Sequence, residues 1–266
     1  PVINKEKCIN CGLCFKRCPQ LNSLSNNGLD KVEVYAAKNN NVEVQRCSSS
    51  GGIFFALAEY VLKNNGVIYG CAFNKDIVAE HMRIDNIDDL VKLRGSKYVQ
   101  SDTKDTFKTV KMDLNDKKFV LYSGTPCQIA GLRLFLGKKY ENLITVDLVC
   151  HGVPSPKLFK KYKEWLEKRY NSKIVNYEFR NKEKNGWGLT SKIVFENGKT
   201  KFLDSRLDPY YKTFLDSITY RESCYNCKYA NTNRISDITL ADYWGIEKEH
   251  SEFYDKFGVS AVIINT

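Results

Sequence analysis

The chain has 266 residues, of which 42% are hydrophobic, so it can bury a substantial core, and its composition excludes an intrinsically disordered tail. Its 41 lysines and arginines outnumber 31 aspartates and glutamates, and the net charge of +10 favours an acidic ligand, an acidic partner protein or a nucleic acid. No apolar run reaches the roughly 20 residues of a spanning helix, so we expect no membrane span.

Ten cysteines occur in the chain, and several of them form CxxC pairs. A small secreted domain would use such cysteines as a disulfide framework, but a chain of this length has ample apolar material for a core. We therefore expect a reducing, cytoplasmic location. The chain starts at Pro1 and residues 261–266 have the pattern of a strand that stops, so we also expect a fragment cut at both ends.

The first motif in chain order is a run of four cysteines, Cys-Ile-Asn-Cys-Gly-Leu-Cys-Phe-Lys-Arg-Cys-Pro, at residues 8–19. The spacing C-x2-C-x2-C-x3-C-P is typical of a chain that wraps thiolates around a [4Fe–4S] cube, and Gly12 lets the backbone fold tightly over inorganic sulfide. A structural zinc site is usually built from two separated pairs, so zinc is the weaker interpretation. We predict iron–sulfur ligands at Cys8, Cys11, Cys14 and Cys18.

The proline after Cys18 indicates which of two cubes each of these cysteines binds. In two-cluster ferredoxins, the fourth cysteine of such a run binds a different cube from the first three. Residues 2–7 resemble the join that leads into the second half of such a ferredoxin, so we expect an upstream cysteine run to have been removed and Cys18 to serve the other cube. A quartet that closes on a single cube remains the alternative.

Leu21 to Asp30 is polar and rich in Asn and Ser, which is typical of a linker. We place a domain boundary there, between the second half of a ferredoxin-like module at residues 1–22 and a larger domain at residues 31–266. Hydrophobic periodicity predicts strands at 32–37, 67–73, 78–84, 118–122 and 143–149 and helices at 52–63, 87–93, 103–114, 128–136 and 155–170.

The last predicted helix is the clearest, with Ser155 as its N-cap and Pro156 at its first position. Its apolar face is predicted to hold Leu158, Phe159, Tyr162, Trp165 and Leu166. Residues 173–203 then turn to a β pattern with a hairpin turn at 196–199. The predicted fold class is α+β: a small ferredoxin-like iron–sulfur module followed by a larger α/β domain with a mixed, partly parallel sheet.

Four further cysteines lie where a coil meets a regular element, which is unusual for cysteines that only pack. Cys127 follows a Gly-Thr-Pro turn, Cys150 precedes His-Gly, and Cys224 and Cys227 form a CxxC pair. For that pair, zinc, a redox disulfide and an iron–sulfur cube all remain open on the residues alone.

Six short sequence blocks follow one another along the chain: Ser-Ser-Ser-Gly-Gly at 48–52, Gly-Ser-Lys-Tyr at 95–98, Gly-Thr-Pro-Cys-Gln at 124–128, Cys-His-Gly at 150–152, Cys-Tyr-Asn-Cys at 224–227 and Ala-Asp-Tyr-Trp-Gly at 241–245. Together they resemble the coenzyme F420 hydrogenase/dehydrogenase beta-subunit family over about residues 30–266. The resemblance implies a flavin, FAD or FMN, beside a [4Fe–4S] cluster held by Cys127, Cys150, Cys224 and Cys227. It also implies electron exchange with coenzyme F420, which is a deazaflavin, or with another two-electron carrier.

Two turns fit a flavin independently of the resemblance, though less sharply. Residues 48–52 form a hydroxyl- and glycine-rich turn that opens a helix, where free N–H groups and the helix dipole would hold a diphosphate; an N-cap is the competing interpretation. Residues 124–126 form a strand-to-helix turn that would face a ligand at the carboxyl end of the sheet. The alternative there is a plain connection with Pro126 at the first helical position.

Single residues carry weaker signals. Lys97 has two interpretations: a positive charge near a phosphate or a reduced flavin, or an ordinary surface lysine. The resemblance favours the role near the flavin, because the block at 95–98 includes Lys97. His151 tunes a cofactor or is a hydrogen-bonded structural histidine. Asp242 is a site residue, a helix cap or a turn former. Cys47 and Cys71 fit the role of small packing hydrophobes.

We therefore predict a flavin-dependent iron–sulfur oxidoreductase with a redox partner protein or subunit, ferredoxin-like or a reductase, and without nucleic acid. One alternative is an electron-relay subunit without its own substrate site, and another is a zinc-stabilised, basic nucleic-acid binder, although no recognition-helix or RNA-module pattern occurs. No catalytic residue is identified. The predicted flavin contacts are Ser49, Ser50, Gly51, Gly52, Lys97, Tyr98, Thr125, Gln128 and His151.

Overall fold

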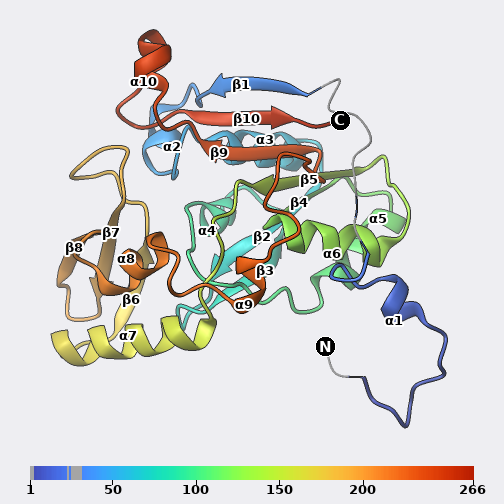
Figure 1. The fold of residues 1–266 in the computed structure, drawn as a ribbon. Coiled ribbons are helices and arrows are strands. Elements are labelled where there is room, and N and C mark those ends of the chain that lie inside the picture. Colours follow the sequence, from blue (N-terminus) through green and yellow to red (C-terminus); the bar gives the residue numbers. More distant parts are fainter. Residues whose placement is uncertain (1–2, 23, 25–31) are drawn as a thin grey trace.

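The computed structural model describes residues 3–22, 24 and 32–266, and Figure 1 shows their fold. The predicted linker at 21–30 therefore lies largely outside the described residues. A large sheet forms the main body, and its strands are β1 (Glu33–Ala37), β2 (Val67–Phe73), β3 (Ala79–Ile84), β4 (Val120–Ser123), β5 (Leu143–Leu148), β9 (Ile238–Asp242) and β10 (Ser260–Ile264).

This sheet has seven strands in the order β1-β10-β9-β5-β4-β2-β3. Its centre is parallel, because β2 pairs with β4, β4 with β5 and β5 with β9 in the same direction. Both edges are antiparallel, with β3 on β2 at one side and β10 and β1 beyond β9 at the other. The predicted mixed, partly parallel sheet is confirmed.

Both faces of the sheet are covered by helices, as a parallel centre requires. Side chains alternate along β2: Val67 and Tyr69 join the buried cluster of α5 (Thr106–Asn115) and α6 (Pro126–Leu136), whereas Ile68 and Ala72 join that of α3 (Ile53–Lys63) and α4 (Leu90–Leu93). These helices and strands lie within a few residues of their predicted positions, because their apolar periodicity is strong.

A smaller unit stands beside the main body (Figure 1). Its antiparallel sheet of order β6-β7-β8 consists of β6 (Ile174–Glu178), β7 (Thr190–Phe195) and β8 (Thr200–Asp204). The predicted hairpin turn at 196–199 is confirmed, since it joins β7 to β8. Helices α7 (Pro156–Tyr170) and α8 (Pro209–Leu215) pack on this sheet around a third core that is rich in aromatic rings.

Helix α7 begins as predicted, with the Ser155 hydroxyl accepting from the backbone N–H of Leu158 at 3.2 Å. Its buried face is narrower than predicted. Phe159 and Leu166 are buried, but Leu158 and Trp165 are 36% and 44% exposed. The small sheet covers only the central stripe of this face, so the flanking apolar residues remain at the surface.

Several short elements were not predicted: α1 (Leu13–Lys16), α2 (Val42–Arg46), α9 (Glu222–Tyr225), β9, α10 (Ile246–Glu249) and a 3-10 turn at Ser251–Phe253. Each has five residues or fewer, which is too short to display a hydrophobic period. In residues 3–22, 24 and 32–266, no helix combines the length and the apolar character that crossing a membrane demands.

Candidate metal and cofactor site

Two of the predicted metal ligands follow neighbouring parallel strands. Strand β4 ends at Ser123, and Cys127 lies in the first turn of α6; strand β5 ends at Leu148, and Cys150 comes two residues later. Because β4 and β5 run in the same direction, their carboxyl ends meet at one edge of the sheet, where open α/β sheets bind ligands. The fold therefore brings Cys127 and Cys150 together from distant positions in the chain.

The CxxC pair is fastened to the same edge. Cys224 lies in α9 and Cys227 follows it. The backbone N–H of Arg221 donates to the carbonyl of Val153 at 2.9 Å, and residues 154 and 220 form an isolated antiparallel bridge. These bonds hold the segment that precedes Cys224 against the loop that follows Cys150.

The four thiols are close enough to influence one another electrostatically. Burial raises the pKa of Cys150 to about 12, and the charges of Cys127, Cys224 and Cys227 add to this increase. Burial also raises the pKa of Cys127, with Cys227 and Cys224 contributing. Within the described residues, no three His, Cys, Asp or Glu side chains are spaced to hold a single metal ion. A donor set of four thiols fits an iron–sulfur cube by its chemistry, since a cube has its own irons and sulfides between the thiolates.

The N-terminal cysteines lie in a different environment. Cys8, Cys11 and Cys14 are exposed, and Cys18 is partly buried. The only regular element among them is the four-residue α1, which has no buried residue. Gly12 precedes it with φ 69°, in the left-handed region that favours glycine, and a Cβ there would meet no atom within 4 Å. The donor set again consists of thiols alone and fits an iron–sulfur cube.

One segment, residues 96–101, connects the two turns predicted to hold a flavin. At its start, the backbone N–H and the hydroxyl of Ser96 both donate to the Ser49 hydroxyl, at 2.7 and 2.8 Å. At its end, the Gln128 amide donates to the Ser101 hydroxyl at 2.9 Å. Lys97 and Tyr98 lie between these anchors. The predicted residues from both turns are thus joined at the carboxyl edge of the sheet.

The turn at 48–52 is built into the protein by its own contacts. The backbone N–H of Gly51 donates to the Ser260 hydroxyl at 3.0 Å, and a Cβ on Gly51 would lie 2.3 Å from the carbonyl oxygen of Ala37. Gly51 is therefore required by the close approach of β1 and β10. Gly52, with φ 82°, is the N-cap of α3, so this turn does start the helix as the competing interpretation expects, but no side chain caps the first N–H groups.

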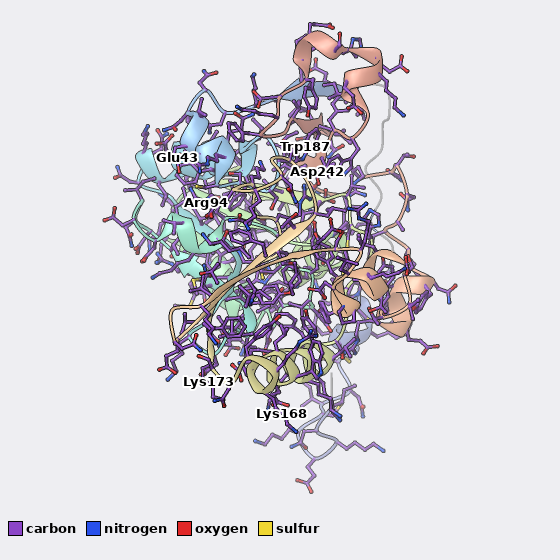
Figure 2. All side chains as sticks on the ribbon, turned by 90° about the vertical axis from the view of Figure 1, so that its left-hand side faces the viewer. Glu43, Arg94, Lys168, Lys173, Trp187 and Asp242 are labelled. Carbon is purple, nitrogen blue, oxygen red and sulfur yellow. The ribbon has the colours of Figure 1, made fainter. Side chains whose placement is uncertain are left out.

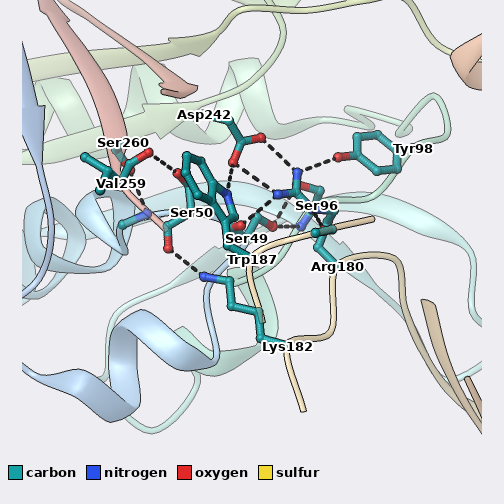
Figure 3. A network of polar contacts seen from close by, with 12 residues as sticks. Ser49, Ser50, Ser96, Tyr98, Arg180, Lys182, Trp187, Asp242, Val259 and Ser260 are labelled. Carbon is teal, nitrogen blue, oxygen red and sulfur yellow. Dashed lines mark hydrogen bonds and ion pairs between the residues drawn. The ribbon is translucent and has the colours of Figure 1, made fainter. Parts of the chain in front are cut away.

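A buried ion-pair network lies beside this turn (Figure 3). Arg180 donates to both carboxylate oxygens of Asp242, at 2.8 and 3.1 Å, and to the carbonyl of Ser49 at 3.1 Å. It also donates to the Tyr98 hydroxyl at 3.1 Å, and the Trp187 indole N–H donates to Asp242 at 2.8 Å. Asp242, at the end of β9, is thus an ion-pair partner here. This network joins β9, the small sheet and the predicted flavin turn.

Two positive or titratable groups face the same region. His81 is buried between the carbonyl of Ser123 and the hydroxyl of Ser101, each 3.0 Å from a ring nitrogen, and burial lowers its pKa to about 4, so it is neutral at pH 7. Burial lowers the pKa of Lys97 to about 8, and its ammonium donates to the carbonyl of Arg94 at 2.9 Å. His81 therefore positions the turn after β4, while Lys97 provides a positive charge.

Some residues differ from their predicted roles. Cys47 is exposed and its thiol donates to Glu43 at 3.2 Å, so the prediction that it packs as a small hydrophobe is wrong. Cys71 lies on β2 and is partly buried, as predicted. His151 is exposed, with its ring 6.5 Å from that of Phe214. Sequence reasoning missed Arg180, Trp187 and His81, because a single buried polar residue leaves no periodic signal.

A surface depression of the protein lies elsewhere, at the C-terminal end of α7. Figure 2 labels Lys168 and Lys173 there, far from the pair Trp187 and Asp242. It holds none of the cysteines and none of the predicted flavin contacts. Its lining consists of Glu164, Glu167, Lys168, Asn171, Ser172, Lys173, Glu196 and Asn197.

Comparisons with known proteins identify the family and the fold. A family model that describes the C terminus of the coenzyme F420 hydrogenase/dehydrogenase beta subunit matches residues 117–266. A second model, described as a 4Fe-4S dicluster domain, matches residues 1–52. A solved structure, a xenon derivative of the F420-reducing [NiFe] hydrogenase complex from Methanosarcina barkeri, has a similar chain with 19% identity and a TM-score of 0.58, covering 91% of this chain and 78% of that chain. None of the curated proteins matches. At this identity the structural likeness concerns the fold, and it confirms the predicted fold class.

Proposed function

The chain belongs to the coenzyme F420 hydrogenase/dehydrogenase beta-subunit family, and from this premise we propose that it is an iron–sulfur flavoprotein that passes electrons between a two-electron carrier and a redox partner. The observation that carries the proposal is the convergence of Cys127, Cys150, Cys224 and Cys227 at the carboxyl edge of the parallel strands. Three separate segments supply these thiols. In this proposal they hold one [4Fe–4S] cube.

The flavin would lie at the same edge, between the turns at 48–52 and 124–128. Segment 96–101 supports this position, because it is hydrogen-bonded to both turns and carries Lys97. The N-terminus of the 11-residue α3 supports it too, since no side chain caps its first N–H groups. A bound flavin would supply the exchange between two-electron and one-electron carriers, which explains an iron–sulfur module at residues 1–22 beside a domain at 31–266.

The residues of this chain have separate tasks in the proposal. Lys97 contributes positive charge for a diphosphate or a reduced flavin ring. Arg180 and Asp242 fix the backbone of Ser49 and the hydroxyl of Tyr98, so both stay in place when a ligand enters. His81 fixes the strand end that precedes Thr125. The net charge of +10 suits an acidic carrier such as coenzyme F420 or an acidic ferredoxin.

The decisive measurement is an anaerobic spectrum with iron, acid-labile sulfide and flavin counted per chain. We expect all three. Iron and sulfide without flavin would favour an electron-relay subunit, and zinc without sulfide would reject iron–sulfur chemistry altogether. Replacing Cys224 or Cys227 by Ser should remove one cluster's iron, spare the N-terminal signal and uncouple flavin reduction from one-electron acceptors. Serine variants with full iron and full coupling would show that the pair is structural.

The flavin site needs a variant that leaves the fold intact. Gly51→Val is unsuitable by itself, because its side chain would collide with β1 and β10 whether or not a flavin binds. Lys97→Met should weaken flavin retention while the iron count stays unchanged. Lys92→Met is the matched control, since Lys92 is 55% exposed and pairs with Asp89, the N-cap of α4. Equal flavin retention in both variants would remove Lys97 from the site.

A further inference from the structure

Two neighbouring residues of the large domain hold the two residues that follow Cys18. The hydroxyl of Tyr229 donates to the carbonyl of Pro19 at 2.7 Å, and the ammonium of Lys228 donates to the carbonyl of Gln20. Both acceptors are main-chain groups, so the contact fixes the path of the backbone at Cys18. The rest of the cysteine run is exposed, whereas Cys18 itself is partly buried.

Tyr229 belongs to the loop that carries the other set of thiols. It comes two residues after Cys227, inside a turn closed by a backbone bond from Ala230 to Cys227 at 3.3 Å. Its side chain is only 7% exposed and lies in the same buried cluster as Cys227. A continuous path therefore runs from Cys18 through Pro19, one hydrogen bond and Tyr229 to Cys227.

The electrostatics of Tyr229 agree with this position. Its pKa is raised, first by burial and then by the charges of Cys127, Cys227 and Cys18. The phenol ring is thus within electrostatic reach of thiols from both predicted cluster sites.

A second contact holds the N-terminal module against α6, which also carries a predicted metal ligand of the large domain. The guanidinium of Arg17 donates to the carbonyl of Leu134 at 2.9 Å, at the end of α6, where the helix dipole favours a cation. A Cβ on Gly137 would lie 1.9 Å from this guanidinium, so the side chain rests directly on the helix end. Helix α6 carries Cys127 in its first turn. The N-terminal module is therefore fixed to both the Cys127 element and the Cys227 loop.

We propose that Tyr229 is a positioning residue that holds Cys18 beside Cys227, so that the cube bound through Cys18 is the one that exchanges electrons with the cube of the large domain. The inference rests on the proposed function, because both cysteine sets must hold cubes. It applies whichever other thiolates complete the cube of Cys18. With both cubes bound, the transfer between them would be of one electron, with no bond made or broken and no proton transferred. Tunnelling weakens steeply with distance, so the anchoring of Cys18 determines the rate.

The test is the electron paramagnetic resonance spectrum of the fully reduced holoprotein, with iron counted per chain. Two reduced cubes held close together broaden each other's signals. We expect this broadening in the wild type, its loss in Tyr229→Ala and a partial loss in Tyr229→Phe, which removes only the hydrogen bond. Tyr225→Phe is the matched control, because the Tyr225 hydroxyl donates to Ser217 and Ile218 within the large domain.

The outcomes separate this inference from the proposed function. Absence of iron at either cysteine set in the wild type rejects the proposed function. Full iron with narrow signals in the wild type, or unchanged broadening in Tyr229→Ala, rejects the inference alone. If Tyr229→Ala does not fold, Tyr229→Phe decides through the same spectrum and through hydrogen exchange, in which the amides of Arg17, Cys18 and Gln20 should exchange faster than in Tyr225→Phe. Unchanged exchange and unchanged broadening in Tyr229→Phe overturn the inference.

Discussion

The two cysteine sets of this protein lie in opposite structural settings. Cys127 and Cys150 follow strands of a seven-stranded sheet and are framed by hydrogen bonds that involve no metal. The cysteines at 8–14 are exposed and accompany one four-residue helix without a buried residue. Where the fold alone already holds the ligands in place, metal binding adds a chemical function but little structure. Where it does not, the free energy of metal binding is also what stabilises the folded chain. The large domain is thus preorganised, and we expect the N-terminal module to depend on its cofactor for its structure.

The largest expected effect follows from removing the iron anaerobically with a chelator. Residues 8–18 should lose their structure, because they bury too little apolar area to order the chain alone. Strands β4 and β5 should stay folded. Hydrogen exchange measures both: amides of the module should exchange like those of an unfolded chain, while those of the large sheet keep their protection. A module that remains protected without iron would break the comparison.

The preorganised region should instead be sensitive to its buried ion pair. The Arg180 side chain is 2% exposed, so Arg180→Met would leave Asp242 without its main partner and should lower the free energy of unfolding by about 3 kcal/mol. The matched control is Arg206→Met, because Arg206 pairs with Asp204 while 84% exposed, and solvent screening leaves such a pair with little effect on stability. Urea denaturation of the iron-free chain measures the two losses, and equal losses would contradict the special role of Arg180.

The pH dependence of stability sharpens the same comparison. The pKa of His81 is lowered from its ordinary 6.5 to about 4 by burial, so below pH 6.5 the unfolded chain takes up a proton that the folded chain refuses. The contribution of His81 is complete above pH 6.5 and is lost as the pH falls towards 4, by about 3 kcal/mol. Denaturant midpoints of His81→Gln should vary less across this range than those of the wild type. The exposed His250 provides the control, since His250→Gln should retain the wild-type slope.

A smaller effect concerns the environment of the cube in the large domain. The Thr125 hydroxyl lies 3.2 Å from the Cys127 sulfur and can donate to a thiolate. Thr125→Val should lower the midpoint potential by tens of millivolts, because hydrogen bonds to ligand sulfur stabilise the reduced state. Thr125→Ser keeps the hydroxyl and should keep the potential. Redox titration of both variants checks this, and a shift in the serine variant would indicate a packing effect.

The sequence predicted the strands and helices whose apolar residues recur with a regular period. Side chains of the strand at 67–73 alternate between two covered faces of the sheet. The helix at 156–170 has a capping serine and apolar residues at helical spacing, so both elements were located closely. The cysteines at 127 and 150 were placed correctly at strand ends for the same reason. Arg180 and Asp242, 62 residues apart, are paired only by the folded chain, and no local pattern distinguishes them from surface charges. Cys47 was misplaced because a lone cysteine has no period at all.

The bridge between residues 154 and 220 has a topological consequence. The chain between these residues forms the small sheet with α7 and α8, and it leaves the main body and returns to it at adjacent points, so it is an insertion with adjacent ends. A change of length in this insertion can leave the interrupted strands in place only if it spares the contacts that Arg180 and Trp187 make with Asp242. Cys150 precedes this insertion in the chain, and Cys224 follows it. A change of length elsewhere in the insertion should therefore leave the thiols at its base in their places.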